Sequence, residues 1–520
     1  MRKMIVLLVS MALAHAATGA AQTLDGGINE RTKTGGKQAP PAQSARPAIA
    51  PDLQDLAVKA ARLLDAGEDT PEARRLLGNV RADARFDDQP RDFRFNVLML
   101  AGYAEMSENQ DEAAGELFRQ ASTLQDTDPD LWYWLSWVEA RRGEHDEAAR
   151  SLARLFKRWP DAAEKILDEH VQRVAFEPDA SQAARAELLQ AIVDSGWKRE
   201  ALGGTSHFHY ALALVRAKEG DTEALRRLVP GITGPTDIVR LLGDKRFDAV
   251  VDADDPAFDP RAAADRQVAA LQAQLRLAPD RLDILSALQT ALLMAGRFQE
   301  VITLAEDVQA ALDAAPADKP AYVAMDELPW VQDQHSRALD ALGRFDASLA
   351  RLEAASRLDE GGRPNVSQAL NLAQRYASLG RPADALAAAA RAGSDMSDFG
   401  RMVQASARQR AHLALGDADA AAKALDYLRE HRASAEAIYL DALVEAGELD
   451  DAAATLIAQL ASAEDRADAL YELHDFRKPP TKPGNVQALA NWEKLLARPD
   501  VEAAVARVGR RLKVDLYRQD

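Results

Sequence analysis

The sequence predicts an all-α protein, built as an α-solenoid of antiparallel helix hairpins. Its 520 residues are rich in Ala, Leu, Asp, Glu and Arg, and only 6% are aromatic, a composition that favours helices over strands. A turn motif, glycine followed five residues later by a small or medium apolar residue, recurs at Gly143, Gly296, Gly343, Gly380, Gly416 and Gly447. Such a glycine ends one helix in a left-handed cap, and the small residue lets the next helix pack back on it. Asn109 stands in the same place before the first clear hairpin.

The first 21 residues have the pattern of a secretory signal peptide. Arg2 and Lys3 precede an apolar run over residues 4–14, and small residues follow. We expect cleavage after Ala21, with a second candidate site after Ala16. An uncleaved inner-membrane anchor is the alternative, because the apolar segment is only just long enough to span a bilayer. The chain has no cysteine, which excludes a lipid on cysteine and disulfides. A periplasmic location is therefore predicted.

The next segment, residues 22–51, is rich in Gly, Pro, Gln and Ala and has no apolar period. It cannot bury enough apolar surface to order itself, so it is predicted to be a disordered tether. The whole chain has a net charge of -18, and the first 51 residues are basic. The remaining body is therefore even more acidic, which argues against nucleic acid or anionic lipid as a partner and allows a basic protein segment.

The body divides into five predicted parts. Residues 52–230 form an N-terminal array of hairpins, and residues 262–473 form a C-terminal one. Between them, residues 231–261 are dense in Pro, Gly and Asp and predict an irregular seam at which the solenoid bends. A proline-rich loop follows over residues 474–485. Residues 486–520 are predicted to be helices that cap the otherwise exposed apolar end of the array.

One helix-pair pattern occurs twice between residues 95 and 160, with an offset of 34 residues. Its matching residues are Trp132, Leu135, Ala148 and Pro160 in the second copy, and Gly102, Ala114 and Phe118 in the first. Ser136 and Leu152 replace a glycine and a phenylalanine of the motif, Leu98 replaces its tryptophan, and Glu139 departs from its tyrosine. This pattern resembles the tetratricopeptide repeat of exported bacterial proteins. The resemblance implies a superhelix whose first helices line a concave groove.

The stretch "PDLWYWLSWVEARRG", residues 129–143, holds three of the chain's seven tryptophans. Asp128 and Pro129 are predicted to open a helix as its cap and first residue. Trp132 falls on the face that packs against the partner helix. Trp134 fits neither this face nor the neighbouring stripe.

A second stripe on the same helix is the predicted binding site. Tyr133, Trp137 and Arg141 are spaced four apart, and the resemblance turns them toward the concave groove. The predicted protein-binding residues, with those in the same slots one repeat earlier, are Met99, Tyr103, Tyr133, Trp137 and Arg141. The alternative is that the first hairpin or the tether covers this apolar patch.

Two other clusters, one of aspartates and one of histidines, are candidate metal ligands. Calcium would need a turn glycine that is missing from the loop with Asp252, Asp254, Asp255 and Asp259. His207 and His209 point to opposite sides of a helix, so a helix start capped by Ser206 is expected instead. No metal site, no cofactor and no catalytic residue is predicted, because no metal-ligand, nucleophile or phosphate-binding motif occurs.

These observations predict a non-enzymatic periplasmic scaffold that binds a segment of another protein in its groove. The partner segment is expected to be basic or apolar. No nucleic-acid partner and no integral membrane domain after signal cleavage are expected. Two alternatives stay open: the periplasmic arm of a machine for envelope export or assembly, and an enzyme whose site no motif reveals.

Overall fold

The computed structural model describes residues 49–68, 70–197, 204–316, 320–359 and 363–518. The predicted signal peptide and residues 22–48 of the predicted tether lie outside these ranges. The chain divides into two compact units, residues 1–197 and 198–520. Most of the described chain is helical, as predicted.

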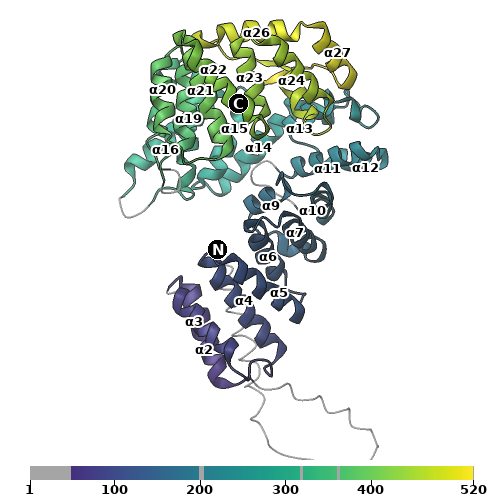
Figure 1. Ribbon diagram of the computed structural model, residues 1–520, viewed down its shortest axis with the longest axis vertical. Coiled ribbons are helices and arrows are strands. Elements are labelled where there is room, and N and C mark those ends of the chain that lie inside the picture. The colour runs from purple at the N-terminus through teal and green to yellow at the C-terminus, as the bar shows by residue number, and fades with distance from the viewer. Residues whose placement is uncertain (1–48, 69, 198–203, 317–319, 360–362, 519–520) are drawn as a thin grey trace, which may run out of the picture. The chain divides into compact units, whose positions relative to one another are not determined.

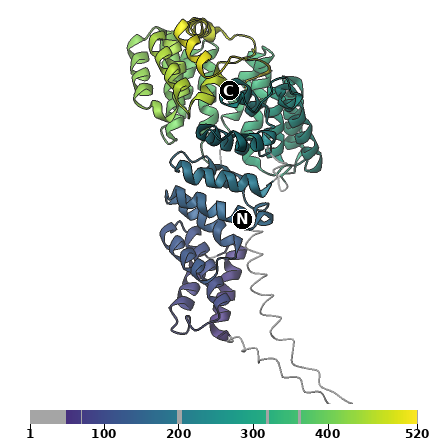
Figure 2. The ribbon, with the colours of Figure 1, turned by 90° about the vertical axis from the view of Figure 1, so that its right-hand side faces the viewer.

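Unit 1 is a stack of helix hairpins (Figures 1 and 2). Its helices are α2 (Pro51–Ala66), α3 (Thr70–Ala82), α4 (Arg91–Ser107), α5 (Asp111–Leu124), α6 (Pro129–Arg141), α7 (His145–Arg158), α8 (Pro160–Ala163), α9 (Asp168–Ala175) and α10 (Gln182–Ser195). The pairs α2 with α3, α4 with α5 and α6 with α7 pack closely, and α10 packs on α7. The short helices α8 and α9 take the place of the first helix in the last hairpin.

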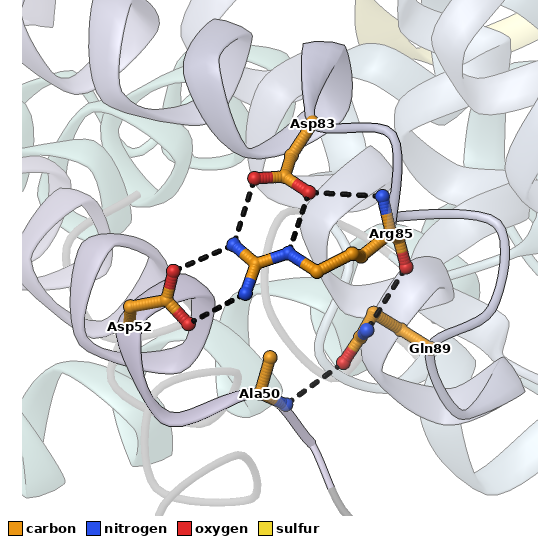
Figure 3. A network of polar contacts seen from close by, with 5 residues as sticks. All are labelled: Ala50, Asp52, Asp83, Arg85 and Gln89. Atoms are coloured by element: carbon orange, nitrogen blue, oxygen red, sulfur yellow. Dashed lines mark hydrogen bonds and ion pairs between the residues drawn. The ribbon is translucent and has the colours of Figure 1, made fainter.

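A cluster of polar contacts anchors the first hairpin where the described chain begins (Figure 3). Arg85 donates to the Asp52 carboxylate, with 2.6 Å from Nη2 to Oδ2, and to Asp83, with 2.9 Å from Nε to Oδ1. Its guanidinium lowers the pKa of Asp83 to about 2. Gln89 accepts from the Ala50 backbone N–H at 2.9 Å and donates to the Arg85 carbonyl at 2.9 Å. Exposed ion pairs add little stability, so the main effect of these contacts is to direct the chain into α2.

The predicted turns and interior positions are confirmed. All six predicted turn glycines have positive φ angles of 72° to 79°, and Asn109 has a φ of 59°. Ala148 and Leu152, on the second helix of the predicted repeat, are fully buried. Trp132 is buried as predicted, and its indole N–H donates to the Asp126 carbonyl at 3.1 Å.

Unit 2 continues as hairpins. Its helices up to residue 355 are α11 (Ser206–Glu219), α12 (Thr222–Leu228), α13 (Pro235–Gly243), α14 (Pro260–Leu277), α15 (Leu282–Met294), α16 (Phe298–Ala314), α17 (Leu328–Ala341) and α18 (Phe345–Ala355). Those that follow are α19 (Val366–Ser378), α20 (Pro382–Arg391), α21 (Asp398–Leu415), α22 (Ala418–Glu430), α23 (Glu436–Ala446), α24 (Leu449–Ala461), α25 (Arg466–Glu472), α26 (Val486–Leu496) and α27 (Pro499–Val508). Short 3-10 turns are η2 (Val229–Gly231), η3 (Lys245–Phe247), η4 (Pro256–Phe258), η5 (Met325–Glu327), η6 (Arg432–Ser434) and η7 (Pro483–Asn485). None of the described helices is long and apolar enough to cross a lipid bilayer.

The predicted seam at residues 231–261 is wrong as a boundary between arrays. The two units divide at residue 197, so the hairpin over residues 206–228 belongs to the C-terminal unit. Within the predicted seam, α13 buries Ile238 and Val239 and packs against α25. The polar residues there serve the fold: Asp244 is fully buried and accepts from the Arg246 backbone N–H at 2.9 Å.

The end of unit 2 returns to its beginning. Helix α13 lies beside C-terminal elements (Figure 1). The Gly243 carbonyl accepts from the Arg510 backbone N–H at 2.9 Å, and the Arg510 guanidinium pairs with Asp248 at 2.6 Å. Arg240 pairs with Asp468, also at 2.6 Å. Contacts between α13 with its following turn and the C-terminal segment therefore close the row of hairpins of unit 2.

The predicted terminal helices over residues 486–520 are partly wrong. Helices α26 and α27 are present, but residues 513–517 form strand β2 (Lys513–Tyr517), which pairs in parallel with β1 (Asp475–Arg477). The cause is a period of two: Val514 and Leu516 are buried while Lys513 and Asp515 are exposed, the alternation of a half-buried strand.

We predict that Gly509→Ala destabilises unit 2. A Cβ at this position would lie 2.4 Å from the Gly243 carbonyl oxygen and 2.7 Å from Leu470 Cδ1, so the closing contact would have to shift. Such overpacking costs about 1–3 kcal/mol of unfolding free energy, measurable by urea denaturation. The control is Gly78→Ala in α3, where a Cβ has open space and should stabilise by about 0.5–1 kcal/mol. An unchanged Gly509→Ala chain would contradict the closure.

We also predict that Glu139 makes unit 1 less stable as pH rises. Its carboxyl is buried in the hairpin of α6 and α7, where Ser151 Oγ donates to it at 2.7 Å. Burial, together with the nearby carboxylates of Glu144 and Glu147, raises its pKa to about 7, although the Ser151 bond opposes this. Between the unfolded pKa near 4.5 and the folded pKa near 7, the folded state holds a proton that the unfolded state has lost. Stability therefore falls over this range.

Glu139→Gln keeps the Ser151 bond without the charge. This variant should be more stable than the unchanged chain at pH 8, on the order of 2–3 kcal/mol, and close to it at pH 4.5. Thermal unfolding followed by tryptophan fluorescence reports on this unit, which holds five of the seven tryptophans. Glu116→Gln, on the exposed side of α5, is the control and should show no such pH-dependent gain. A Glu139→Gln gain that is equal at both pH values would contradict the assignment.

Candidate functional site

The candidate site lies on the first helices of unit 1, and α6 is its centre. Asp128 caps this helix as predicted, because its Oδ1 accepts from the Asp130 backbone N–H at 2.9 Å. Pro129 occupies the first helical position, where its missing N–H costs nothing. The cap fixes where α6 begins, so its aromatic residues face α4 on one side and α9 on the other.

The structure separates the five predicted binding residues into buried and partly exposed ones. Met99 and Tyr133 are only 2% and 1% exposed, so the prediction that these two side chains line an open groove is wrong. Tyr103 and Trp137 are half-buried and reach the surface. Arg141 is partly exposed, and its guanidinium is held by the Asp111 carboxylate, with 2.9 Å from Nε to Oδ2.

Side chains of the stripe are buried because each first helix packs against the next one along the stack. The Tyr133 ring meets the ring of His170 on α9 edge-on, with centroids 5.7 Å apart. His170 of the next repeat therefore covers Tyr133.

Aromatic rings form a continuous row across three helices. Tyr103 on α4 meets Trp134 edge-on at 5.4 Å, and Trp134 meets Tyr133 at 5.0 Å. Tyr133 then meets Trp137 at 6.4 Å, and Trp137 stacks on His170 at 4.1 Å with an interplanar angle of 8°. We call these five residues the aromatic row. Trp134, which fits no stripe of the helical pattern, is the link between α4 and α6.

His170 is held as a neutral imidazole in one tautomer. Ser136 Oγ lies 2.7 Å from the Tyr133 carbonyl, to which it donates. Its oxygen therefore accepts from His170 Nε2, also at 2.7 Å. This leaves His170 Nδ1 to accept from the Arg173 guanidinium at 3.2 Å. Burial, with Arg173 adding a smaller effect, lowers the pKa of His170 to about 3.

A small hollow opens beside the end of the row. Its volume is about 130 Å³, and its lining residues are Ala140, Arg141, His145, Ala148, Arg173, Val174 and Glu177. The Arg173 guanidinium also lies over the Trp137 ring, 4.5 Å from its centroid. Both apolar and charged side chains line the hollow, which suits one side chain of an extended segment.

Sequence patterns alone missed His170 and Arg173. The signal was nevertheless present, because His170 follows Ser136 by 34 residues, the offset of the repeat itself. The helix that carries it is short and preceded by a break, so no clear amphipathic pattern marks it as the first helix of a third repeat.

One group of described residues has metal-ligand geometry. Donor atoms of His145, Glu177 and Asp179 lie within 4.8 Å of one another. Arg173 lines the same hollow as two of them, and its positive charge opposes a bound cation. This group therefore carries no metal proposal.

Residues of the aspartate-rich loop and of the segment that begins at Ser206 have structural roles. In the aspartate-rich loop, Asp252, Asp255 and Asp259 each accept a backbone N–H two residues ahead, which is how carboxylates cap turns. The predicted Ser206 cap is wrong: Ser206 Oγ donates to Asp237 at 2.6 Å and accepts from the backbone N–H of Gly234 at 2.8 Å. The side chain thus joins α11 to α13.

No protein-family model and no curated protein matches the sequence. Solved structures similar to it include the following three. The APC/C hetero-tetramer Cut9–Hcn1 has 13% identity and a TM-score of 0.35, over 87% of this chain and 79% of that one. The TPR domain of P58(IPK) has 13% identity and a TM-score of 0.21, over 79% and 100%. Naa15/Naa10 bound to HypK-THB has 14% identity and a TM-score of 0.25, over 88% and 73%.

Similarities at these TM-scores carry no assignment by themselves. The fold is assigned from the chain's own geometry. Helix pairs follow one another, left-handed glycine turns join them, and Ser136 meets His170 one 34-residue repeat later. The fold is a tetratricopeptide-like α-solenoid.

Proposed function

We propose that this protein is a non-enzymatic scaffold that binds an extended segment of another protein along α4, α6 and α9 of unit 1. The aromatic row carries the proposal, because it joins rings from three successive first helices and two of these rings reach the surface. Tyr103 is half-buried at one end of the row, and Trp137 is half-buried beside His170 at the other end. A partner segment with apolar side chains could cover both.

The composition of the row suits binding. Tyr, Trp and Arg dominate the residues that contribute most to protein interfaces, because they offer large rigid areas and polar tips. Trp134 Nε1 is buried and has no hydrogen-bond partner among the described residues. The Arg173 guanidinium over Trp137 adds a donor beside the exposed ring edge. An extended partner backbone would supply carbonyl acceptors to this surface.

Buried titratable groups of unit 1 support a non-enzymatic role. Glu139 is bonded to Ser151 inside a hairpin, and His170 is bonded on both nitrogens. A general acid or base needs a free atom within reach of a substrate. Neither group offers one, so their shifted pKa values reflect burial in the fold.

We propose further that the protein is exported to the bacterial periplasm. The support is the signal-peptide pattern of residues 1–21. The acidic net charge of -18 favours a partner whose apolar segment is flanked by basic residues.

The test is the double variant Tyr103→Ala with Trp137→Ala. It should lose at least about tenfold in capture of the partner, because each interface aromatic contributes about 2 kcal/mol when it is a hot spot. Capture is measured by quantitative mass spectrometry of proteins retained by the immobilised full chain. Circular dichroism checks that the helices stay formed.

The matched control is Trp159→Ala, another half-buried tryptophan of unit 1 that also lies under an arginine, Arg158 at 4.5 Å. It lies outside the aromatic row and should leave capture unchanged. If the double variant does not fold, Tyr103→Ala alone replaces it. Equal capture by the folded variants and the control would overturn the proposed function.

A further inference from the structure

A proline-rich segment of unit 2, residues 478–485, crosses the ends of three first helices, α17, α19 and α21. We propose that these helix ends form a binding site for a proline-rich segment with a lysine, a glycine and an asparagine at this spacing. The chain's own residues 478–485 occupy the site, in competition with a partner segment of the same chemistry. This inference concerns unit 2 and is independent of the binding surface proposed on unit 1.

Lys482 is recognised by a buried carboxylate. Its Nζ lies 2.6 Å from Asp340 Oδ2 near the end of α17, and its side chain is only 15% exposed. Lys478, four residues earlier, is 73% exposed and approaches only its near neighbour Asp475, at 4.0 Å. The site therefore selects one lysine by its position, while the other is an ordinary surface lysine.

Asn485 is recognised by a fixed guanidinium on α21. Its Oδ1 accepts from Arg410 Nη2 at 2.7 Å. Arg410 is held by two other first helices, since Nη1 donates to Gln374 of α19 at 2.9 Å and Nε pairs with Glu445 of α23 at 2.8 Å. Nη2 is thus the guanidinium nitrogen left to donate to the bound segment.

Gly484 lets the segment approach the backbone of α19. A Cβ there would lie 2.3 Å from the Ala377 carbonyl oxygen and 2.8 Å from that of Ser378. Backbone atoms at the end of a helix cannot yield as a side chain can, so glycine is required at this position. Two prolines of the segment lie against turn glycines: Pro480 by Gly343, and Pro483 by Gly380.

The segment can leave without unfolding the array. Apart from Lys482 and Asn485, its residues are exposed, so little apolar area holds it in place. Its flanks are anchored independently, by buried Phe476 in β1 and buried Leu495 in α26. Regions with few buried apolar contacts open locally at low cost.

The vacated site would stay formed. Asp340 keeps its pair with Arg375 at 2.9 Å, and Arg410 keeps its pair with Glu445. Both pairs are largely buried, and buried polar groups are costly unless all their bonds are made. A new segment that supplies a cation to Asp340 and an acceptor to Arg410 would therefore be favoured.

The experiment uses the full chain with Gly484→Val, in which the side chain should expel the segment. The probe is a fluorescent peptide of residues 478–486, KPPTKPGNV, and fluorescence anisotropy measures its binding. The variant should bind the peptide at least about tenfold more tightly than the unchanged chain, where the segment competes. Hydrogen exchange should show faster exchange of residues 481–486 in the variant.

Charge-matched peptides supply the controls. A peptide with Lys482→Glu should lose binding to the variant, whereas one with Lys478→Glu should keep most of it. Adding Asp340→Asn to the Gly484→Val chain should also weaken binding. The proposal is overturned if residues 481–486 stay protected in the variant, if the displaced chain does not bind the peptide, or if the two substituted peptides bind equally.

Discussion

One constraint governs this fold: a hairpin of two amphipathic helices buries the faces that meet and leaves a stripe of the first helix to be covered from outside the pair. The left-handed glycine turns bring each second helix back onto its first, and small residues such as Ala148 allow the close contact. Everything else in the structure depends on how the remaining stripe is covered. Repeat proteins solve this along the stack with the next repeat and at the ends with special elements.

The two units meet the constraint differently. In unit 1, rings from successive first helices cover one another, so the stripe becomes the aromatic row, and Tyr103 and Trp137 remain at the surface. In unit 2, roughly the last 45 residues run back along the array. This length exceeds that of one repeat. Lys482 and Asn485 contact first helices there, and Arg510 closes on Gly243. Unit 1 therefore leaves two rings of its stripe at the surface, whereas the stripe of unit 2 is occupied by its own chain.

Much of this structure could be predicted from local sequence patterns. Its long-range pairings could not. Turn glycines, the Asp128 cap and the buried Trp132 follow from neighbours within one or two turns, so the sequence contains their cause. The place of His170 depends on a degenerate third repeat, and that of Trp134 on the partner ring of Tyr103. The seam failed as a boundary because Ile238 and Val239 find their core against α25, more than 200 residues later. No local period reports such a pairing.

We propose that the stripe of unit 1 is open to a partner, whereas residues 478–485 cover the stripe of unit 2. Paired photocrosslinking in cells tests it most directly, with a photoreactive phenylalanine placed at Trp137 in one chain and at Gln374, one side chain from the bound segment, in another. We predict a crosslink to another protein from position 137 and an internal crosslink to residues 478–486 from position 374. Crosslinks to a partner from position 374, with none from position 137, would contradict the account.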